Sequence, residues 1–291
     1  MITSTLLLLA IAAAGAAPPD ADGDEAQERQ RQEAVAQLAP AQAKRLELLG
    51  GVDPEEKLTL FPEPLLRWSN PTAGSVHGEV FLWTQDERPA AISSIYRWYH
   101  PYQDSTVEIV SVSEQALAAR EDGKTQWQTK SPGLAFQPLP KAPAPAGNRG
   151  SRLIQMRTLA RRFSADLADK RGGDEVPREL RLLNQPAHRY ESQEHQIVDG
   201  CLFAFVEGTD PEAWLLLEVV DGKGGPAWRY ALARMNVDPL EICLDDQAVQ
   251  SWPGLREAWS DRTRPYVMFN FDPQRVQIDA PPMAPPAARN P

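Results

Sequence analysis

A polar stretch near residue 190 contains the side-chain types that bind divalent metal ions. His188, Glu191 and His195 combine two imidazoles with a carboxylate, which are ligands that zinc accepts. The odd separation of His188 and His195 would point them to opposite faces of an extended strand, so only a turn would bring them together. A metal-dependent hydrolase site is one interpretation, and a polar loop between two strands is the other.

A second unusual segment carries four ring side chains in close succession. Tyr96, Arg97, Trp98, Tyr99 and His100 follow one another directly. Aromatic faces beside cationic groups can bind a sugar or an extended peptide. The other interpretation is a strand in which every second aromatic residue packs in the hydrophobic core, since aromatic residues mostly contribute to packing.

The two cysteines, Cys201 and Cys243, allow one disulfide in an exported protein. Strand alternation places Cys201 on the face of Phe203, whereas Cys243 falls opposite Ile242 and Leu244, which makes a disulfide slightly less favourable. Pairing cannot be read from the sequence, so both states stay open. No C-x-x-C spacing supports a zinc site.

Motifs of the common enzyme classes do not occur in the chain. It contains no G-x-S-x-G, H-E-x-x-H, P-loop, G-x-G-x-x-G or EF-hand pattern. Catalytic groups can still assemble from distant positions, but the sequence favours a non-enzymatic protein without a cofactor.

Charge and composition narrow the class of partner. The 291 residues carry a formal net charge of −10, and 42% of them are hydrophobic. The apolar fraction is typical of a packed core. An acidic chain is repelled by phosphate backbones, so we expect no nucleic-acid partner.

The N-terminus has the pattern of a cleavable export signal. The apolar run Leu6–Ala14 is followed by Gly15, Ala16 and Ala17, small residues that suit a signal peptidase. The run is too short for a membrane span, and no cysteine follows it to carry a lipid. Although residues 1–5 lack a basic side chain, we expect residues 1–17 to be removed, leaving a soluble periplasmic or secreted protein without a membrane span.

The remaining chain predicts an α+β fold of mainly antiparallel strands. Composition and periodicity predict disorder for 18–28, a helix over 27–49 interrupted at Pro40, and a helix over 151–167 whose apolar stripe includes Phe163 and Leu167. The predicted segments are a helical segment within 18–60, a first β unit over 61–139, a linker over 140–150, a helix plus second β unit over 151–279, and a Pro-rich disordered tail over 280–291.

The two β units match when residue n is set beside residue n+122. Gly78 then meets Gly200, and Phe81 meets Phe203. The order of predicted elements also agrees, which indicates two tandem helix-plus-β-meander units and an internal duplication. Chance matches between two β-meanders are the alternative.

Six segments within residues 60–252 resemble a set of exported proteins of planctomycete-type bacteria without an assigned activity. They are Leu66–Pro71, Gly78–Thr84, Gln155–Arg157, Glu179–Leu183, Leu202–Glu212 and Tyr230–Asn236. The resemblance implies export but no activity, cofactor or catalytic residue.

These observations favour a ligand- or protein-binding module that uses a sheet face or the groove between its halves. The alternatives are the metal-dependent hydrolase and a carrier in which a curved sheet and helix enclose an apolar ligand. The partner, the ligand and the oligomeric state are not readable from the sequence.

Overall fold

The computed structural model describes residues 21–51, 55–169 and 176–277, and the predicted export signal and Pro-rich tail lie outside them. Within the described residues the fold is α+β with mainly antiparallel strands, as predicted. The helices are α1 (Ala21–Arg45), α2 (Arg149–Ala160), and the short 3-10 helices η1 (Arg256–Trp259) and η2 (Pro273–Arg275).

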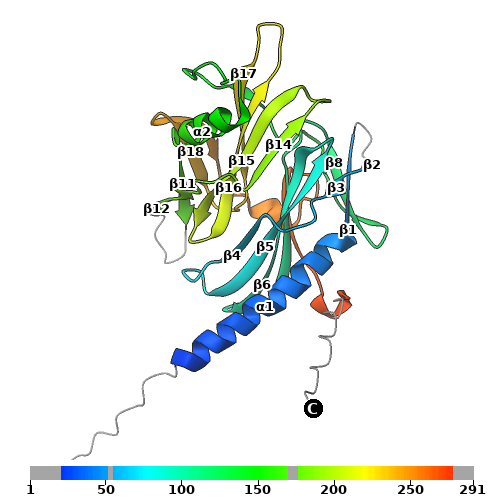
Figure 1. Cartoon of the computed structure of the whole chain (residues 1–291). Coiled ribbons are helices and arrows are strands. Elements are labelled where there is room, and N and C mark those ends of the chain that lie inside the picture. Colours follow the sequence, from blue (N-terminus) through cyan, green and yellow to red (C-terminus); the bar gives the residue numbers. More distant parts are fainter. Residues whose placement is uncertain (1–20, 52–54, 170–175, 278–291) are drawn as a thin grey trace, which may run out of the picture.

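The strands of the first half precede α2, and those of the second half follow it (Figure 1). The first ten are β1 (Leu46–Gly50), β2 (Glu56–Lys57), β3 (Thr59–Leu60), β4 (Leu66–Ser69), β5 (Ser75–Gln85), β6 (Arg88–His100), β7 (Ser105–Ser111), β8 (Leu117–Glu121), β9 (Lys124–Gln128) and β10 (Gln137–Pro138). The others are β11 (Phe163–Asp169), β12 (Val176–Glu179), β13 (Arg181–Leu182), β14 (His188–Ser192), β15 (Ile197–Glu207), β16 (Asp210–Val220), β17 (Ala227–Arg234), β18 (Leu240–Leu244), β19 (Gln247–Trp252) and β20 (Tyr266–Asn270).

Two six-stranded sheets form the centre of the molecule. The first has the order β20-β7-β6-β5-β3, the second has the order β10-β17-β16-β15-β13, and β4 and β14 pair with β5 and β15. Their facing sides share one hydrophobic core, to which Leu82 and Trp214 contribute from opposite sheets. This core binds the two halves together, because burial of apolar surface is the main stabilising term in folding.

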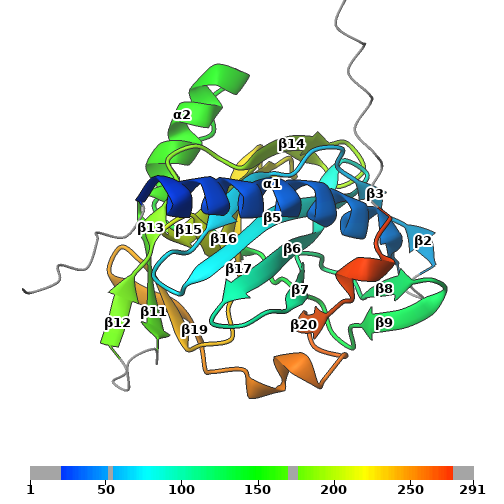
Figure 2. The ribbon, with the colours of Figure 1, turned by 90° about the horizontal axis from the view of Figure 1, so that it is seen from below.

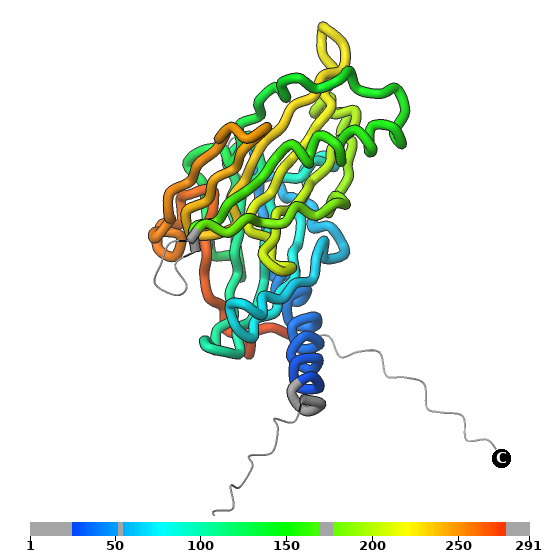
Figure 3. The backbone as a smooth tube through the Cα atoms, turned by 90° about the vertical axis from the view of Figure 1, so that its left-hand side faces the viewer, coloured from blue at the N-terminus to red at the C-terminus, as the bar shows by residue number. Residues whose placement is uncertain are grey.

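An outer layer covers the far side of each central sheet. Helix α1 and the sheet β2-β1-β8-β9 pack on the first one, and helix α2 and the sheet β12-β11-β18-β19 pack on the second one. Figure 2 shows α1 lying across the first central sheet, and Figure 3 shows it on the side away from the second half. None of the described helices is long and apolar enough to cross a membrane.

The two central hairpins pair in the same register. Trp83 faces Ala91 in the first, Phe205 faces Ala213 in the second, and each pairing is followed by a register shift at the next residue. The offset is 122 residues, as in the sequence comparison. In the next strands the offset is 123 residues, because Ser111 pairs with Ala91 as Arg234 pairs with Ala213. Positions of the two halves can therefore be compared through their pairing.

The edge strands are exchanged between the halves. Strand β10 follows the first half but pairs with β17, and β20 follows the second half but pairs with β7. Each central sheet is therefore completed by chain from the other half. The boundaries predicted between the two β units do not include this exchange.

Both predicted helices end earlier than expected. Helix α2 begins after Asn148, whose side chain accepts a hydrogen bond from the Ser151 amide, and ends at Ala160. Phe163 and Leu167 alternate as buried residues of β11 instead of continuing the helical stripe. Pairing of β11 with β18 overrides helix propensity here.

Helix α1 also departs from the expectation. It begins at Ala21, within the stretch predicted to be disordered, contains Pro40, and ends at Arg45. Residues Leu46–Gly50 form β1, which pairs with β8. The Leu-rich end of the predicted helix is thus a strand, because Leu46 and Leu48 bury their side chains beneath α1.

Candidate functional site

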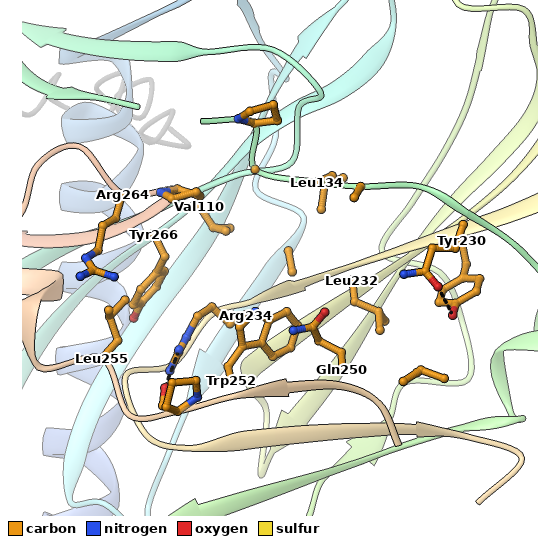
Figure 4. Close-up of a pocket in the computed structure, with 18 of the residues that line it drawn as sticks. Val110, Leu134, Tyr230, Leu232, Arg234, Gln250, Trp252, Leu255, Arg264 and Tyr266 are labelled. Atoms are coloured by element: carbon orange, nitrogen blue, oxygen red, sulfur yellow. Dashed lines mark hydrogen bonds between the residues drawn. The ribbon is translucent and has the colours of Figure 1, made fainter. Parts of the chain in front are cut away.

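A cleft of about 800 Å³ opens where the chain crosses between the halves (Figure 4). Its walls come from β17 and β19 of the second half, β7 and β20 of the first sheet, and the segment 132–137. This volume is in the range of small-molecule and peptide sites. This cleft lies at the junction between the two halves.

One wall of the cleft is an uncovered strand edge. Strand β10 pairs with only Arg229 and Tyr230, and no strand of the described residues pairs with the rest of this edge of β17. On the same edge the Trp228 carbonyl accepts a hydrogen bond from the Leu139 amide. The Met235 amide instead donates to the Glu212 carbonyl of β16, on the opposite edge of β17. Alternation then directs the main-chain groups of Leu232 and Arg234 into the cleft.

The equivalent edge of the first half is covered. Strand β20 makes five residue pairs with β7, from Tyr266 with Val110 to Asn270 with Thr106. The Ser111 amide, equivalent to that of Arg234, donates to the Pro265 carbonyl at 2.8 Å. The cleft therefore lies along the part of β17 that has no partner strand like the one that β20 provides for β7.

Segment 132–136 does not pair with β17, because its amides form hydrogen bonds with the end of the first central sheet. The amides of Gly133 and Leu134 both donate to the Ser113 carbonyl, at 2.9 and 3.2 Å. Since Ser113 lies just after β7, these bonds hold the segment on the first-half side. Leu134 and Ala135 consequently form the wall opposite Leu232 rather than pairing with it.

Apolar and aromatic side chains make up most of the lining. Leu134, Leu232 and Leu255 project toward the space, with Trp252 and Tyr266 beside them (Figure 4). Trp252 is half-buried, so its ring is partly available to a ligand. Rings of this kind supply large contact areas with defined orientation.

Arg234 lies at one end of the cleft and is 7% exposed. Its guanidinium donates to the carbonyls of Asn236, Asp238 and Pro253 at 2.7 to 2.9 Å and lies over the Tyr266 ring, 5.9 Å from its centre. Burial lowers the pKa of Arg234 in spite of nearby Tyr266 and Asp238. An anionic ligand group at this end would therefore stabilise the charge.

The other end of the cleft is polar and neutral. The Tyr230 hydroxyl donates to Gln137 Oε1 at 3.1 Å, which links β17 to β10 where their pairing begins. Gln250 lies between the two ends, and the exposed side chains of Glu257 and Arg264 stand at the rim. The cleft thus has one cationic end, an apolar middle and an amide-lined end.

The predicted aromatic segment is divided between two faces of β6. Tyr96 and Trp98 line a second, smaller pocket between the sheets. Arg97 and Tyr99 lie on the opposite face, where the Arg97 guanidinium is 5.2 Å from the Tyr99 ring centre, and His100 is exposed. Strand alternation therefore separates residues that the sequence places together.

The three predicted metal ligands contact different neighbours. His188 is stacked on Tyr190 with ring centres 5.9 Å apart, and burial lowers its pKa. Glu191 pairs with Arg149 at 3.2 Å, and His195 Nε2 lies 3.8 Å from Asp86 Oδ2. Among the described residues, no group of three or more His, Cys, Asp or Glu side chains is arranged to hold a metal ion.

Both cysteines are free thiols, so Cys201 and Cys243 do not form a disulfide in this structure. Cys201 is buried in the core beneath α2, whereas Cys243 is half-buried on β18. Ile242 and Leu244 belong to the core that contains Cys201. Alternation along β18 directs Cys243 away from that core, which is why the two sulfurs do not meet.

Sequence reasoning did not identify the cleft residues. Arg234 follows the apolar run Ala231, Leu232 and Ala233 at the end of β17, and a cation in such a place is a signal that could have been noticed. Pro132 and Pro138 bracket the crossing segment, and proline limits strand pairing. The position of Tyr266 follows from the exchange of edge strands, which no local pattern predicts, whereas Trp252 ends the hairpin of β18 and β19.

Comparisons with protein families, with curated proteins and with solved structures found no match. The resemblance to exported planctomycete-type proteins therefore stays a prediction.

Proposed function

We propose that the protein is a binding module that takes an extended peptide segment into the cleft as an added strand on β17. The observation that carries this proposal is the difference between two equivalent edges. Strand β20 pairs with five residues of β7, and β10 pairs with two residues of β17. An uncovered strand edge is a template for another strand, and main-chain hydrogen bonds then supply affinity.

The lining suggests the chemistry of the peptide. Alternate side chains of an added strand would pack against Trp252 and Leu134, which favours apolar residues at those positions. A carboxylate, from an acidic side chain or a C-terminus, would lie near Arg234. We therefore propose a short, largely apolar segment with a negative charge at one end.

The experiment uses calorimetry to measure the binding of a pentapeptide of valine and threonine. The N-terminus of the peptide is blocked, and its C-terminal carboxylate is free. Leu232→Pro removes a cleft-facing amide while leaving the amides that bond β16, so it is expected to abolish binding without unfolding the protein. Leu232→Ala keeps the amide and is the matched control. Equal affinity of both variants, with thermal stability unchanged, would refute the added strand.

An apolar small molecule is the second candidate ligand, because the cleft volume of about 800 Å³ suits one. It depends on the side chains of the lining rather than on the strand edge. Binding of a fluorescent fatty-acid analogue that survives Leu232→Pro but is lost in Trp252→Ala would support this candidate.

We further propose that the two halves arose by internal duplication. The equal register of the hairpins, the reciprocal exchange of β10 and β20, and the shared sheet order support it. The two sequences keep matching glycines, Gly78 and Gly200, at one equivalent position. A relative that has a single half would support duplication, and relatives without the register match would count against it.

Export remains part of the proposal, on the strength of Leu6–Ala14 and the small residues that follow. The mature chain is expected to begin after Ala17 and to occupy the periplasm or medium. N-terminal analysis of the protein recovered from its native compartment tests this, and a chain that still begins at Met1 would contradict it.

A further inference from the structure

Strand β10 occupies the same place on β17 as the end of β20 occupies on β7. The Leu139 amide, just after β10, donates to the Trp228 carbonyl at 3.1 Å, and the Phe271 amide, just after β20, donates to the Ser105 carbonyl at 3.0 Å. Trp228 and Ser105 are equivalent positions, because the pairing relates them by the offset of 123 residues. Both strands run antiparallel to their partners. Strand β20 therefore shows the course that a complete strand on β17 would take.

The first residues of β20 have no counterpart on β17. In the first half, Pro265–Met268 lie along the end of β7, and the Pro265 carbonyl accepts a hydrogen bond from the Ser111 amide at 2.8 Å. The offset of 123 residues makes Ala231–Arg234 the equivalent positions on β17. Residues 133–136, which precede β10, are held by the Ser113 carbonyl instead of pairing there. The cleft is therefore the place of a short extended segment that this chain supplies in one half and not in the other.

In the first half the incoming segment is also held from β9. The Trp127 indole donates to the Arg264 carbonyl at 2.7 Å. The Lys130 amide, just after β9, donates to the Thr263 carbonyl at 3.0 Å. The segment that leads into β20 thus lies between the edges of β7 and β9.

Gln250 of β19 takes the place of Trp127 of β9. Trp127 pairs with Ala119 beside a register shift, and Gln250 pairs with Ile242 beside a shift of the same kind. The Gln250 side chain projects into the cleft (Figure 4). Its amide nitrogen carries two hydrogens, and one of them is directed to the Ser251 carbonyl at 3.3 Å. Gln250 is therefore placed to donate to a ligand carbonyl, as the Trp127 indole does in the first half.

The cationic end of the cleft limits how far the ligand can be held. The same offset of 123 residues relates Lys130 to Pro253, which has no amide hydrogen and so cannot repeat the bond that Lys130 makes. The Pro253 carbonyl instead accepts a hydrogen bond from Arg234 at 2.9 Å. The other end is closed by β10, which begins at Gln137. A bound segment is thus held between the carbonyl that Gln250 reaches and the start of β10.

We propose that the cleft binds a short segment that runs antiparallel to β17 and begins with an acidic residue opposite Arg234. This inference rests on the proposed function, and it adds the direction, the register and the source of the charge. The second residue would lie opposite Ala233 and the third opposite Leu232, and the carbonyl before the first residue would accept a hydrogen bond from Gln250. An antiparallel segment has its C-terminal end toward Gln137. The negative charge near Arg234 therefore belongs to a side chain and not to a C-terminus.

The second residue of the segment should be large and apolar. Its counterpart in the first half is Tyr266, which pairs with Val110 and belongs to the core between the central sheets. Ala233 belongs to the same core and is smaller than Val110, so it leaves room beside it for a larger ligand side chain. Leu134 and Leu255 line the cleft and pack against this core. A phenylalanine at the second position would contact them.

The test compares two tetrapeptides of identical composition and opposite order, with both ends blocked. They are glutamate-phenylalanine-valine-threonine and threonine-valine-phenylalanine-glutamate. Calorimetry with the whole chain should show about tenfold tighter binding of the first, because only its order places the carboxylate opposite Arg234, and one charge-assisted hydrogen bond is typically worth that factor. Replacing its glutamate by glutamine should weaken binding to a similar extent.

The outcomes separate this inference from the proposed function. Equal affinity for the two peptides, or tighter binding of the reversed one, would overturn the direction while strand addition on β17 would stand. Binding of neither peptide would refute both the added strand and its direction.

Two variants test the register. Gln250→Ala should weaken binding of the glutamate-first peptide about fivefold, a factor typical of one neutral hydrogen bond. Gln247→Ala, on the exposed start of β19 and outside the cleft, is the matched control and should leave the affinity unchanged. Thermal denaturation of both variants checks that they fold alike. Unchanged affinity in Gln250→Ala, or an equal loss in Gln247→Ala, would overturn the register.

Discussion

Arg88 of the first half donates through Nε to Glu218 Oε1 of the second half at 3.1 Å, and the carboxylate is fully buried. The pair therefore joins β6 to β16 across the interface between the central sheets. A buried carboxylate of this kind requires its partners, because removal of one leaves desolvated charge.

Substitution Arg88→Met is expected to lower the free energy of unfolding by about 3 kcal/mol, because one partner of a buried ion pair is lost while Arg229 remains. Urea denaturation measures the change. Arg275→Met is the matched control, since the exposed Arg275–Asp272 pair at 3.6 Å should contribute little. Equal effects of the two variants would show that the buried pair does not stabilise the interface.

Gly78 and Gly200 are equivalent positions at which a side chain would collide with a ring. A Cβ at Gly78 would lie 2.5 Å from Trp68 Nε1, and one at Gly200 would lie 2.5 Å from Tyr190 Cζ. Alanine at either position should destabilise by about 1–3 kcal/mol through overpacking. Gly224→Ala, where a Cβ meets nothing within 4 Å, should be near neutral.

The glycine prediction is checked by thermal denaturation of the three single variants. Trp68→Leu combined with Gly78→Ala should recover part of the loss, because the shorter side chain leaves room. A double variant that is only additive would contradict the proposed collision.

Local patterns were sufficient for the central hairpins but insufficient for the cleft. The matching glycines and alternating apolar residues of β5 and β15 predict paired strands, and those strands form. Phe163 and Leu167 satisfy both a helical stripe and a strand face, so only the pairing with β18 decides between them.

The cleft depends on contacts between distant parts of the chain. It exists because Ser113 holds segment 132–136 away from β17 and because β20 arrives from the end of the second half. The residues that surround these two contacts in the sequence have no pattern that predicts either of them. The aromatic segment around Trp98 is visible in the sequence, but its division between two faces of β6 decides which of its rings can line a pocket.

The raised pKa of Glu108 predicts a loss of stability with rising pH. Its ordinary value is 4.5, and burial and Glu212 raise it to about 8. Between these values the unfolded state releases the proton that the folded state retains, so the free energy of unfolding should fall as pH rises from about 4.5 to about 8. Glu108→Gln keeps the neutral form and should remove this part of the fall.

The measurement is urea denaturation of both proteins at several pH values between 4 and 9. Other titrating groups affect the two proteins alike, so the difference between the curves isolates Glu108. A constant difference across the range would mean that the Glu108 pKa is the same in the folded and unfolded states.

The two thiols should react at very different rates. Burial raises the pKa of Cys201 to about 12, and the side chain is inaccessible, so its reactive thiolate is scarce in the folded protein. Cys243 is half-buried and should be modified by a maleimide under native conditions. Mass spectrometry should show one label on the native protein and two after denaturation without reductant. Two protected sulfurs after denaturation would instead mean that a disulfide forms, and Cys243→Ser would then release Cys201 for labelling.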